Sequence, residues 1–383
     1  MGAANLPDRF NPMSVTFVSL NKGWALGTVS CSQAGECLAL RSTNDTGKTW
    51  SVSPLPSSLL ALVDRKISGV PQVQPGPGYF GVRFADPRDG WLFGGVEQGG
   101  NFEPLMWATH DAGATWTRQP ALPGMAAGIG PVMDVEASGG RVYALVPGKS
   151  SAVLDWAPVG RNDWRVVPTG RLSWPAGGAQ PTGSIVLQDG SGWVVVGNDR
   201  GVTGTARMVN GVWGPFTPPC GGVGDSYTVP AARNGTDLAA VCRMGGFASP
   251  VTKTAPPGAR QGSSWLYVSP DAGDHFYART QLSSDLTASF TVAAYPAPNQ
   301  FLVGEGSTTN KLLASYDAGR HWATVYDGDV FYLGFTSPTQ GVGLVVQAPK
   351  PGCSASSQCG QPTTAMIITF DGGRHWQKVS FGM

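Results

Sequence analysis

Charged residues are scarce in this chain of 383 residues: Asp, Glu, Lys and Arg make up 13% of it, and the formal net charge is +1. No run or patch of basic residues is visible. This argues against a nucleic-acid partner, because phosphate binding depends on clustered Lys and Arg side chains. No apolar stretch reaches the length of about 18 residues that a membrane-spanning helix needs, so the sequence predicts no transmembrane segment.

Histidine is rare as well, with only His110, His275, His321 and His375 in the chain. All four fall inside copies of one repeated motif, which leaves none for the loops between the copies. A Ser-His-Asp or Cys-His nucleophile is therefore not expected in those loops, and neither is a histidine-based metal centre. No Asp-rich calcium loop is visible, so the sequence predicts no metal and no cofactor.

The chain does contain one short motif in five copies. Its frame is Ser/Thr-x-Asp-x-Gly-x-Thr/His-aromatic. A repeat of this kind sets the fold, because each copy belongs to one supersecondary unit that packs against its neighbours. The five copies are Thr43–Trp50, Thr109–Trp116, Ser269–Phe276, Ser315–Trp322 and Thr369–Trp376.

This motif resembles the Asp-box, or BNR repeat, of sialidases and of many non-enzymatic β-propellers. The resemblance implies a hairpin turn between the third and fourth strands of a blade. There the Asp accepts hydrogen bonds from backbone N–H groups, the Gly supplies a positive φ, and the aromatic ring packs between blades. It also implies a structural role for the aspartates, because each belongs to a separate blade and they cannot act together as metal ligands or catalytic pairs. They are Asp45, Asp111, Asp271, Asp317 and Asp371.

A second landmark gives the number of blades. An inner strand is followed, after an offset of seven residues, by a second strand that often begins Gly-Trp, as in Phe17 with Trp24 and Phe84 with Trp91. The third copy pairs Asp134 with Arg141. Seven such units occur, and the two without a clear motif copy carry degenerate turns at 160–164 and 210–213. Seven units give about 55 residues for each, which suits four short strands with turns.

The predicted fold is therefore all-β, a seven-bladed β-propeller of four-stranded antiparallel blades. Residues 1–12 are expected to form an N-terminal leader and residues 13–383 a single propeller domain. Ring closure is not expected to need an N-terminal strand in the last blade, because that unit ends with an outer strand of its own. The expected blades are 13–55, 78–120, 130–168, 181–217, 226–281, 288–328 and 330–381.

Six cysteines indicate an oxidising compartment. Two pairs share a Cys-x5-Cys spacing, and pairing in sequence order gives three disulfides. Zinc is the alternative, but the spacings do not suit the common zinc sites and no His lies near. We expect an exported protein, secreted or held at the cell envelope, with its signal segment absent from this sequence. We also expect a monomer. The expected pairs are Cys31–Cys37, Cys220–Cys242 and Cys353–Cys359.

Three long insertions suggest where a ligand binds, although neutral loop drift is the alternative. They fall at 56–79, 243–262 and 347–362. In a propeller, the loops between second and third strands and the connections between blades lie on one face, which we call the loop-rich face. The predicted disulfides and all three insertions map to it, and insertions in repeat proteins collect on the binding face. The candidate ligand-binding residues are Arg83, Asp225, Tyr227, Arg243, Arg260 and Asp285.

The resemblance to sialidases does not extend to their catalytic set, which is an arginine triad, a Tyr–Glu nucleophile pair and an acid Asp. The early Arg-Ile-Pro-type motif has only a poor counterpart in Arg9–Pro12, and none of the five glutamates stands where it marks a partner of a tyrosine nucleophile. The motif pairing is more similar to that of the photosystem II assembly-factor type of propeller, which implies a scaffold. A photosynthetic role does not follow, because only the repeat is shared.

Two functional hypotheses result. The first is a non-catalytic binding or scaffold propeller that recognises a protein or an extracellular glycan through the loop-rich face. The second is a carbohydrate-active enzyme, sialidase-like or another glycoside hydrolase or lyase, with carboxylates on that face, since two suitably spaced carboxylates suffice for many glycosidases. A deep central pocket with two facing carboxylates would favour the enzyme, and a flat or plugged channel would favour the scaffold.

Overall fold

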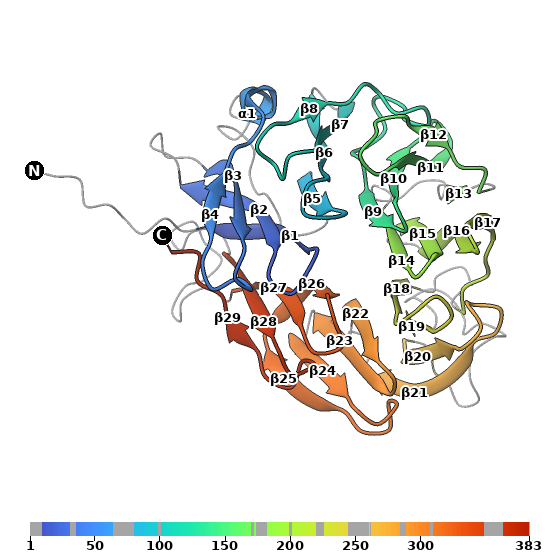
Figure 1. Ribbon diagram of the computed structural model, residues 1–383. Coiled ribbons are helices and arrows are strands. Elements are labelled where there is room, and N and C mark those ends of the chain that lie inside the picture. Colours follow the sequence, from blue (N-terminus) through green and yellow to red (C-terminus); the bar gives the residue numbers. More distant parts are fainter. Residues whose placement is uncertain are drawn as a thin grey trace, which may run out of the picture.

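The fold was examined in a computed structural model of the chain. It describes residues 10–30, 36–63, 80–98, 101–169, 172–173, 182–198, 201–219, 226–243, 260, 262–283, 289–306, 309–347 and 363–382. Seven separate antiparallel sheets stand around a common centre (Figure 1). The protein is thus an all-β, seven-bladed propeller, as the repeats predict.

Each blade is built from strands that follow one another along the chain. Blade 1 contains β1 (Asn11–Phe17), β2 (Gly23–Ser30), β3 (Glu36–Thr43) and β4 (Ser51–Ser53). Blade 2 contains β5 (Phe80–Phe84), β6 (Gly90–Gln98), β7 (Asn101–Thr109) and β8 (Thr117–Arg118). Blade 3 contains β9 (Asp134–Ser138), β10 (Arg141–Pro147), β11 (Ser151–Pro158) and β12 (Arg165–Val166), with β13 (Leu172–Ser173) also paired to β11. Blade 4 contains β14 (Thr182–Gln188), β15 (Ser191–Asn198), β16 (Gly201–Val209) and β17 (Val212–Pro215).

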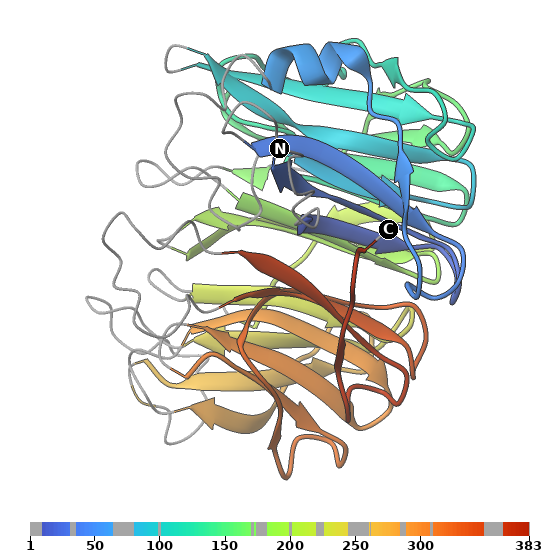
Figure 2. The same cartoon turned by 90° about the vertical axis from the view of Figure 1, so that its left-hand side faces the viewer.

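The second half of the ring repeats this order. Blade 5 contains β18 (Ser226–Ala232), β19 (Leu238–Arg243), β20 (Ser264–Ser269) and β21 (Tyr277–Ser283). Blade 6 contains β22 (Ser289–Ala297), β23 (Gln300–Gly306), β24 (Lys311–Ser315) and β25 (Ala323–Asp327). Blade 7 contains β26 (Asp329–Phe335), β27 (Gly341–Val346), β28 (Thr364–Thr369) and β29 (Gln377–Lys378). The first strand of each blade is innermost, and Figure 2 shows the strands crossing the ring from one face to the other.

Burial follows the position of a strand in its blade. The second strands are buried almost throughout, as the burial of the first six residues of β2 shows, because neighbouring blades cover both faces of the sheet. Such strands read as nearly continuous apolar runs rather than alternating ones. The fourth strands are more exposed, and in blades 2 and 3 they have only two residues, as β8 and β12 show. The core therefore lies between blades, in a series of clusters around the ring.

Among the described residues no strand is exchanged at the ring joint, since blade 7 is built from 329–378 and blade 1 from 11–53. Hydrogen bonds join these blades: Thr364 Oγ1 donates to the Pro12 carbonyl (2.7 Å) and Gln340 Nε2 donates to the Leu20 carbonyl (2.8 Å). An apolar cluster fills the joint. Its buried members are Phe10, Val15, Ala25, Trp50, Val342, Leu344, Met366, Ile368, Val379 and Phe381.

The five motif copies form turns between third and fourth strands, which we call box turns. In the first, Thr43 Oγ1 donates to Asp45 Oδ1 (2.8 Å) and accepts from Gly47 N (3.0 Å). Thr49 N and Oγ1 donate to the two Asp45 oxygens at 2.9 and 2.6 Å. Gly47 has φ +80°, a conformation that glycine adopts without strain. The same bonds recur around Asp111, Asp271, Asp317 and Asp371, with a His ring in place of the second Thr in the last three.

Box turns also connect neighbouring blades. Trp24 Nε1 in blade 1 donates to the Ala112 carbonyl in the box turn of blade 2 (3.3 Å). Trp193 Nε1 in blade 4 donates to the Ala272 carbonyl in the box turn of blade 5 (3.3 Å). The same turn is tied to its own blade, because Ala112 N donates to the carbonyl of Arg88 in the β5–β6 turn (2.9 Å). The motif therefore fastens each of these blades to the one before it.

Acid should weaken the box turns. The Thr49 hydroxyl and backbone N–H lower the pKa of Asp45 from 3.8 to about 2, so its contribution to stability is full above the ordinary pKa and is lost as pH falls through about 2. We expect Asp45→Asn to flatten this acid loss, measured as urea midpoints between pH 6 and pH 2. Thr49→Val, which removes a donor but keeps the carboxylate, should give an intermediate curve. Parallel curves for wild type and Asp45→Asn would contradict this role.

Three details differ from the sequence expectations. The first strand begins at Asn11, inside the expected leader, because Pro12 already belongs to the ring joint. The insertion at 56–79 begins with helix α1 (Ser57–Val63), whose Leu59 is buried between blades 1 and 2, so this part is packed structure rather than a free loop. In blade 3 the inner strand starts at Asp134 and ends at Ser138 instead of ending at Asp134.

Candidate functional site

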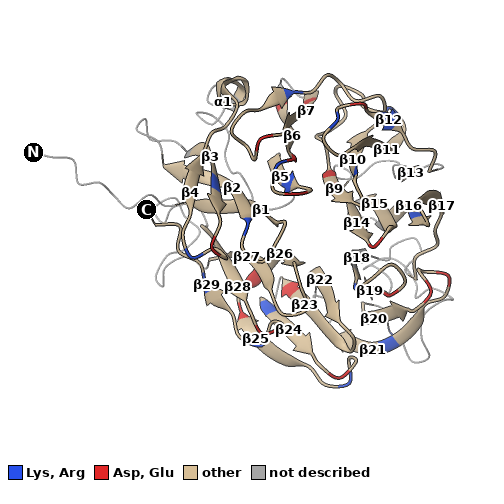
Figure 3. Cartoon of the chain, in the orientation of Figure 1, with Lys and Arg blue, Asp and Glu red and all other residues tan. Residues whose placement is uncertain are grey.

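The innermost strands, which surround the centre of the ring in Figure 1, carry a group of charged side chains. Arg83 lies on β5, the inner strand of blade 2, and its Nη2 is 2.7 Å from Glu136 Oε1 on β9 of blade 3. Arg83 Nε also donates to the Val135 carbonyl (3.1 Å). The side chains of Arg83 and Glu136 are 18% and 23% exposed, so the ion pair is largely shielded from solvent. In Figure 3 a basic segment on β5 and an acidic one on β9 occupy these neighbouring inner strands.

A tyrosine extends the group across the channel. Tyr332, on β26 of blade 7, lies near enough to Arg83 to help hold the pKa of the guanidinium above its ordinary value. Arg83, Asp134, Glu136 and Tyr332, which we call the channel cluster, therefore come from three blades.

Both carboxylate oxygens of Asp134 accept hydrogen bonds from backbone N–H groups. Its Oδ1 accepts from its neighbour Val135 N (2.8 Å), and its Oδ2 accepts from Ile185 N on β14 of blade 4 (2.8 Å). Carboxylates that accept backbone N–H bonds in this way are held in a fixed position. Asp134 therefore fastens blade 3 to blade 4 at the channel wall.

Burial changes the acidity of both carboxyl groups. It raises the pKa of Asp134 to about 6, against the opposing charge of Arg83. It raises the pKa of Glu136 to about 7, again against Arg83, and the neighbouring Asp134 charge adds to the rise. Burial thus raises the pKa of two neighbouring carboxyl groups, and perturbed pKa values are a feature of binding and catalytic sites.

The acidity of Glu136 predicts a pH-dependent stability. A raised pKa means that folding favours the protonated form, so this contribution is complete below the ordinary value of 4.5 and is lost as pH rises through about 7. We expect the unfolding free energy of wild type, relative to Glu136→Gln, to fall between these values, measured by urea unfolding at several pH values. Glu305→Gln, on β23 outside the cluster, is the control and should not reproduce the effect. A constant difference between wild type and Glu136→Gln would show that Glu136 does not titrate in this range.

Of the six predicted ligand-binding residues, four lie within the described part of the chain. Arg83, expected on the loop-rich face, lies instead near the end of β5 that leads into the β5–β6 turn, on the side of the box turns. Arg243 ends β19, and Arg260 is exposed just before β20, so both belong to blade 5 and are not brought to Arg83. The backbone of Tyr227 pairs with Cys242 in that blade. Asp225 and Asp285 lie outside the described residues.

Asp134, Glu136 and Tyr332 were not selected from the sequence. A signal for the first two exists, because residues two apart on a strand face the same way, and Asp134-x-Glu136 places both carboxyls on one side of an inner strand. Tyr332 has no comparable signal, since its partner lies two blades away around the ring.

The histidine side chains contact carboxylates in turns of the blades. The rings of His275, His321 and His375 contact the carboxylates of their own box turns, and His110 Nδ1 lies 2.5 Å from Asp89 Oδ1. Within the described ranges, no three His, Cys, Asp or Glu side chains are grouped to hold a metal ion.

Only two cysteines, Cys37 and Cys242, fall within the described residues, and neither is a free thiol. The predicted partners Cys31 and Cys220, and the pair Cys353–Cys359, lie outside them, so the pairing stays a prediction. No helix in the described part of the chain is long and apolar enough to cross a membrane.

Comparison with known proteins supports the fold. No protein-family model matches the chain, and no curated protein matches it in sequence. Among solved structures, YCF48 bound to a D1 peptide is similar with a TM-score of 0.55 and 16% identity, over 96% of this chain and 95% of that one. The BP39L lectin from Burkholderia pseudomallei has a TM-score of 0.54 and 13% identity, over 97% and 100%. A GH74 xyloglucanase from Xanthomonas campestris has a TM-score of 0.51 and 16% identity, over 96% of this chain but 60% of the enzyme.

Proposed function

We propose that this protein is an exported, non-catalytic binding propeller that recognises a protein or an extracellular glycan through its loop-rich face. The observation that supports this most is the channel cluster. Arg83 is paired with Glu136, and the two oxygens of Asp134 accept backbone N–H bonds, so the cluster links blades 2, 3 and 4. Groups satisfied by one another are suited to rigid structure more than to attacking a substrate.

The fold neighbours and the cysteines agree with this reading. A propeller of similar shape has been solved with a peptide, and another is a lectin, so the fold serves protein and carbohydrate ligands in other proteins. Six cysteines in a chain whose described thiols are not free fit an oxidising, extracytoplasmic location. In this proposal Asp225, Tyr227, Arg243, Arg260 and Asp285 remain the candidate ligand contacts, and Arg83 does not.

A second function, that of a carbohydrate-active enzyme, is favoured by one observation. Asp134 and Glu136 stand two residues apart on β9, and burial raises the pKa of Glu136 to about 7. A carboxyl group with a pKa near neutrality can act as a general acid, which glycoside hydrolysis requires beside a second carboxylate. A xyloglucanase is among the proteins of similar fold. For catalysis, Glu136 would have to separate from Arg83. Asp134 would have to give up the hydrogen bonds from its backbone donors.

The two functions are separated by exposing the purified, oxidised protein to a mixed glycan library and analysing bound and released fractions by mass spectrometry. The proposal expects retention of a glycan without cleavage, reduced by Arg243→Ala. If no glycan is retained or cleaved, pull-down from an envelope fraction should recover a protein partner, again reduced by Arg243→Ala. Cleaved products that disappear in Glu136→Gln but persist in Glu305→Gln would establish the enzyme and refute the non-catalytic proposal.

A further inference from the structure

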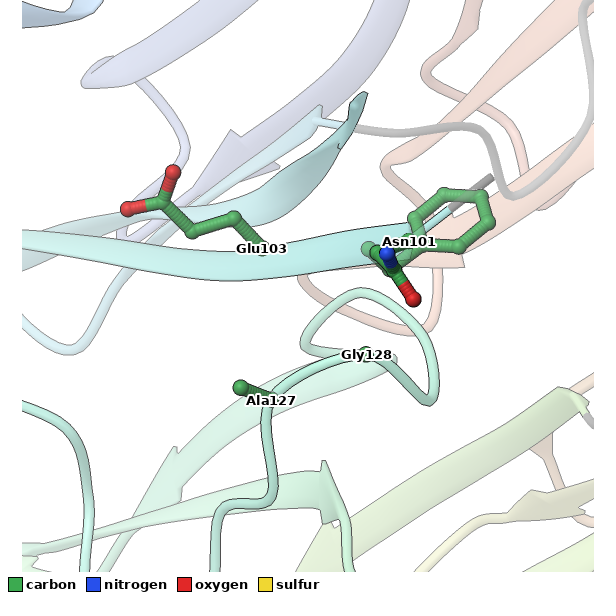
Figure 4. Close-up of a pocket in the computed structure, with 5 residues that line it drawn as sticks. Asn101, Glu103, Ala127 and Gly128 are labelled. Carbon is green, nitrogen blue, oxygen red and sulfur yellow. The ribbon is translucent and has the colours of Figure 1, made fainter. Parts of the chain in front are cut away.

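A stretch of chain that is neither strand nor helix connects blade 2 to blade 3. It runs from the end of β8 to the start of β9, and we call its residues 120–131 the strap. Figure 4 shows Ala127 and Gly128 of the strap beside Asn101 and Glu103 at the start of β7. Because it is a connection between blades, the strap belongs to the loop-rich face.

Backbone hydrogen bonds hold the strap to both blades. Ala126 N donates to the Pro147 carbonyl of blade 3 (2.7 Å), and Gly128 N donates to the Phe102 carbonyl of blade 2 (2.7 Å). Leu122 is only 3% exposed and packs in the apolar cluster between these blades. The strap therefore has a defined closed position.

One ionisable side chain also holds the strap. Gly124 N donates to Asp155 Oδ2 (3.0 Å) on β11 of blade 3. Position 124 has no room for a side chain, because a Cβ atom there would lie 2.3 Å from Val153 Cγ1 and 3.1 Å from Asp155 Oδ1. The strap therefore rests directly on the Asp155 carboxyl group.

The surroundings of Asp155 suit a neutral carboxyl group better than a carboxylate. The side chain is fully buried, Oδ2 accepts the Gly124 N–H, and Oδ1 has no hydrogen-bond partner in the described part of the chain. Burying a carboxylate without a countercharge is unfavourable, whereas the neutral acid avoids most of this cost. Burial accordingly raises the pKa of Asp155 to about 6, against the opposing effect of the Gly124 N–H.

No charged group on the elements packed around Asp155 balances this carboxylate. The strap itself contains no Asp, Glu, His, Lys or Arg. The influences on the pKa of Asp155 are burial and the Gly124 N–H, with no charge of the described residues among them. Its titration is therefore governed by burial under the strap. The other charged side chains on β6 to β12 are Glu97, Glu103, Arg118, Asp134, Glu136, Arg141 and Arg165.

We propose that Asp155 is a pH-sensitive latch for the strap. In its neutral form the carboxyl group stays buried and accepts the Gly124 N–H, so the strap is closed. In its ionised form the carboxylate gains hydration when the strap lifts, so opening becomes easier. The strap is thus held more firmly in acid than at neutral pH. This regulation of the loop-rich face goes beyond the binding proposed there and does not depend on which ligand is bound.

The test measures amide hydrogen exchange of the intact, oxidised protein between pH 4 and pH 7.5, with each rate divided by the intrinsic rate at that pH. The reporters are the amides of Gly124, Ala126 and Gly128, and those of the buried strand β10 report global unfolding. A raised pKa means that the extra stability of the closed strap is complete below the ordinary value of 3.8 and is lost as pH rises through about 6. We expect the opening constant to rise by about a hundredfold between these values, since each pH unit contributes a factor of ten, and to stay level above them.

Three variants separate the latch from other effects of pH. Asp155→Asn keeps an acceptor for the Gly124 N–H but cannot ionise, so opening of its strap should not depend on pH. Asp163→Asn, at an exposed aspartate of the same blade, is the matched control and should keep the wild-type profile. Gly124→Ala, whose added Cβ displaces the strap from Val153, should leave the strap open at every pH. Carbon-13 NMR of the carboxyl groups should then show the Asp155 midpoint moving from about 6 in wild type toward 3.8.

Strap exchange that stays constant across the pH range in wild type would overturn the proposal. A wild-type profile that persists in Asp155→Asn would overturn it too, because another group would then be the one that titrates. A strap as strongly protected as β10 at every pH would show that it opens only on global unfolding, which refutes the latch. If Asp155→Asn does not fold, wild type still decides: coinciding midpoints of carboxyl titration and strap opening support the latch, and separate midpoints refute it.

Discussion

Replacing Trp24 with alanine is expected to lower the free energy of unfolding by about 3–5 kcal/mol, the range for removing a large buried aromatic side chain. Trp24 is fully buried and stacks on Phe84 of blade 2, with ring centroids 3.6 Å apart and planes within 3°. Its Nε1 also donates to Ala112 in the neighbouring box turn. One side chain thus joins blades 1 and 2 by packing and by a hydrogen bond, and both are lost in Trp24→Ala. Urea unfolding at neutral pH measures the change.

One further variant separates the hydrogen bond from the packing, and a second variant is a control. Trp24→Phe keeps an aromatic ring but removes the N–H donor, so it should cost about 1–3 kcal/mol, the usual range for leaving a buried acceptor unpaired. Val52→Ala, at an exposed residue of β4 in the same blade, should change stability by less than about 0.5 kcal/mol. A Trp24→Ala protein as stable as Val52→Ala would show that the contact between these blades is not important for the fold.

Phe381→Ala should be comparably damaging, because it opens the joint between the first and last blades. Phe381 is 8% exposed, and its ring lies 4.6 Å from that of Phe10 and 4.8 Å from that of Trp50. In the part of the chain that the structure describes, no strand is exchanged across this joint, and apolar packing and hydrogen bonds from Thr364 and Gln340 hold it together. We expect a loss of about 3–5 kcal/mol, measured by urea unfolding.

Phe370→Ala is the matched control for the joint. Phe370 belongs to the same blade but is 47% exposed, so its removal should change stability by less than about 0.5 kcal/mol. Limited proteolysis adds a second readout, since an opened joint should expose chain near both ends while the other blades stay protected. Equal stability of Phe381→Ala and Phe370→Ala would mean that the ring is closed by contacts other than those described.

The fold class could be predicted because the repeated turn depends on local chemistry. Asp45 and Thr49 bond within a span of four residues, and Gly47 needs its positive φ for reasons that hold in any protein. Blade 3 shows where this reasoning stops. Its first two strands are joined by Gly139 and Gly140, both with positive φ, in a two-residue turn that a fixed offset of seven residues did not anticipate.

That difference also explains why the channel cluster was not predicted. The landmark of the inner strand in blade 3 was Asp134, whereas in the structure the strand continues to Ser138, so that Glu136 stands in the middle of β9 and meets Arg83. Arg83 and Tyr332 come from blades 2 and 7, and no spacing along the chain encodes contact across the channel.

We propose that the channel cluster is a structural link and that the protein binds its ligand without cleaving it. The most direct measurement incubates the purified protein with a panel of extracellular polysaccharides and quantifies new reducing ends, with Glu136→Gln and Glu305→Gln in parallel. We expect no new reducing ends from any of the three proteins. Reducing ends produced by wild type and by Glu305→Gln, but not by Glu136→Gln, would contradict it and assign Glu136 to catalysis.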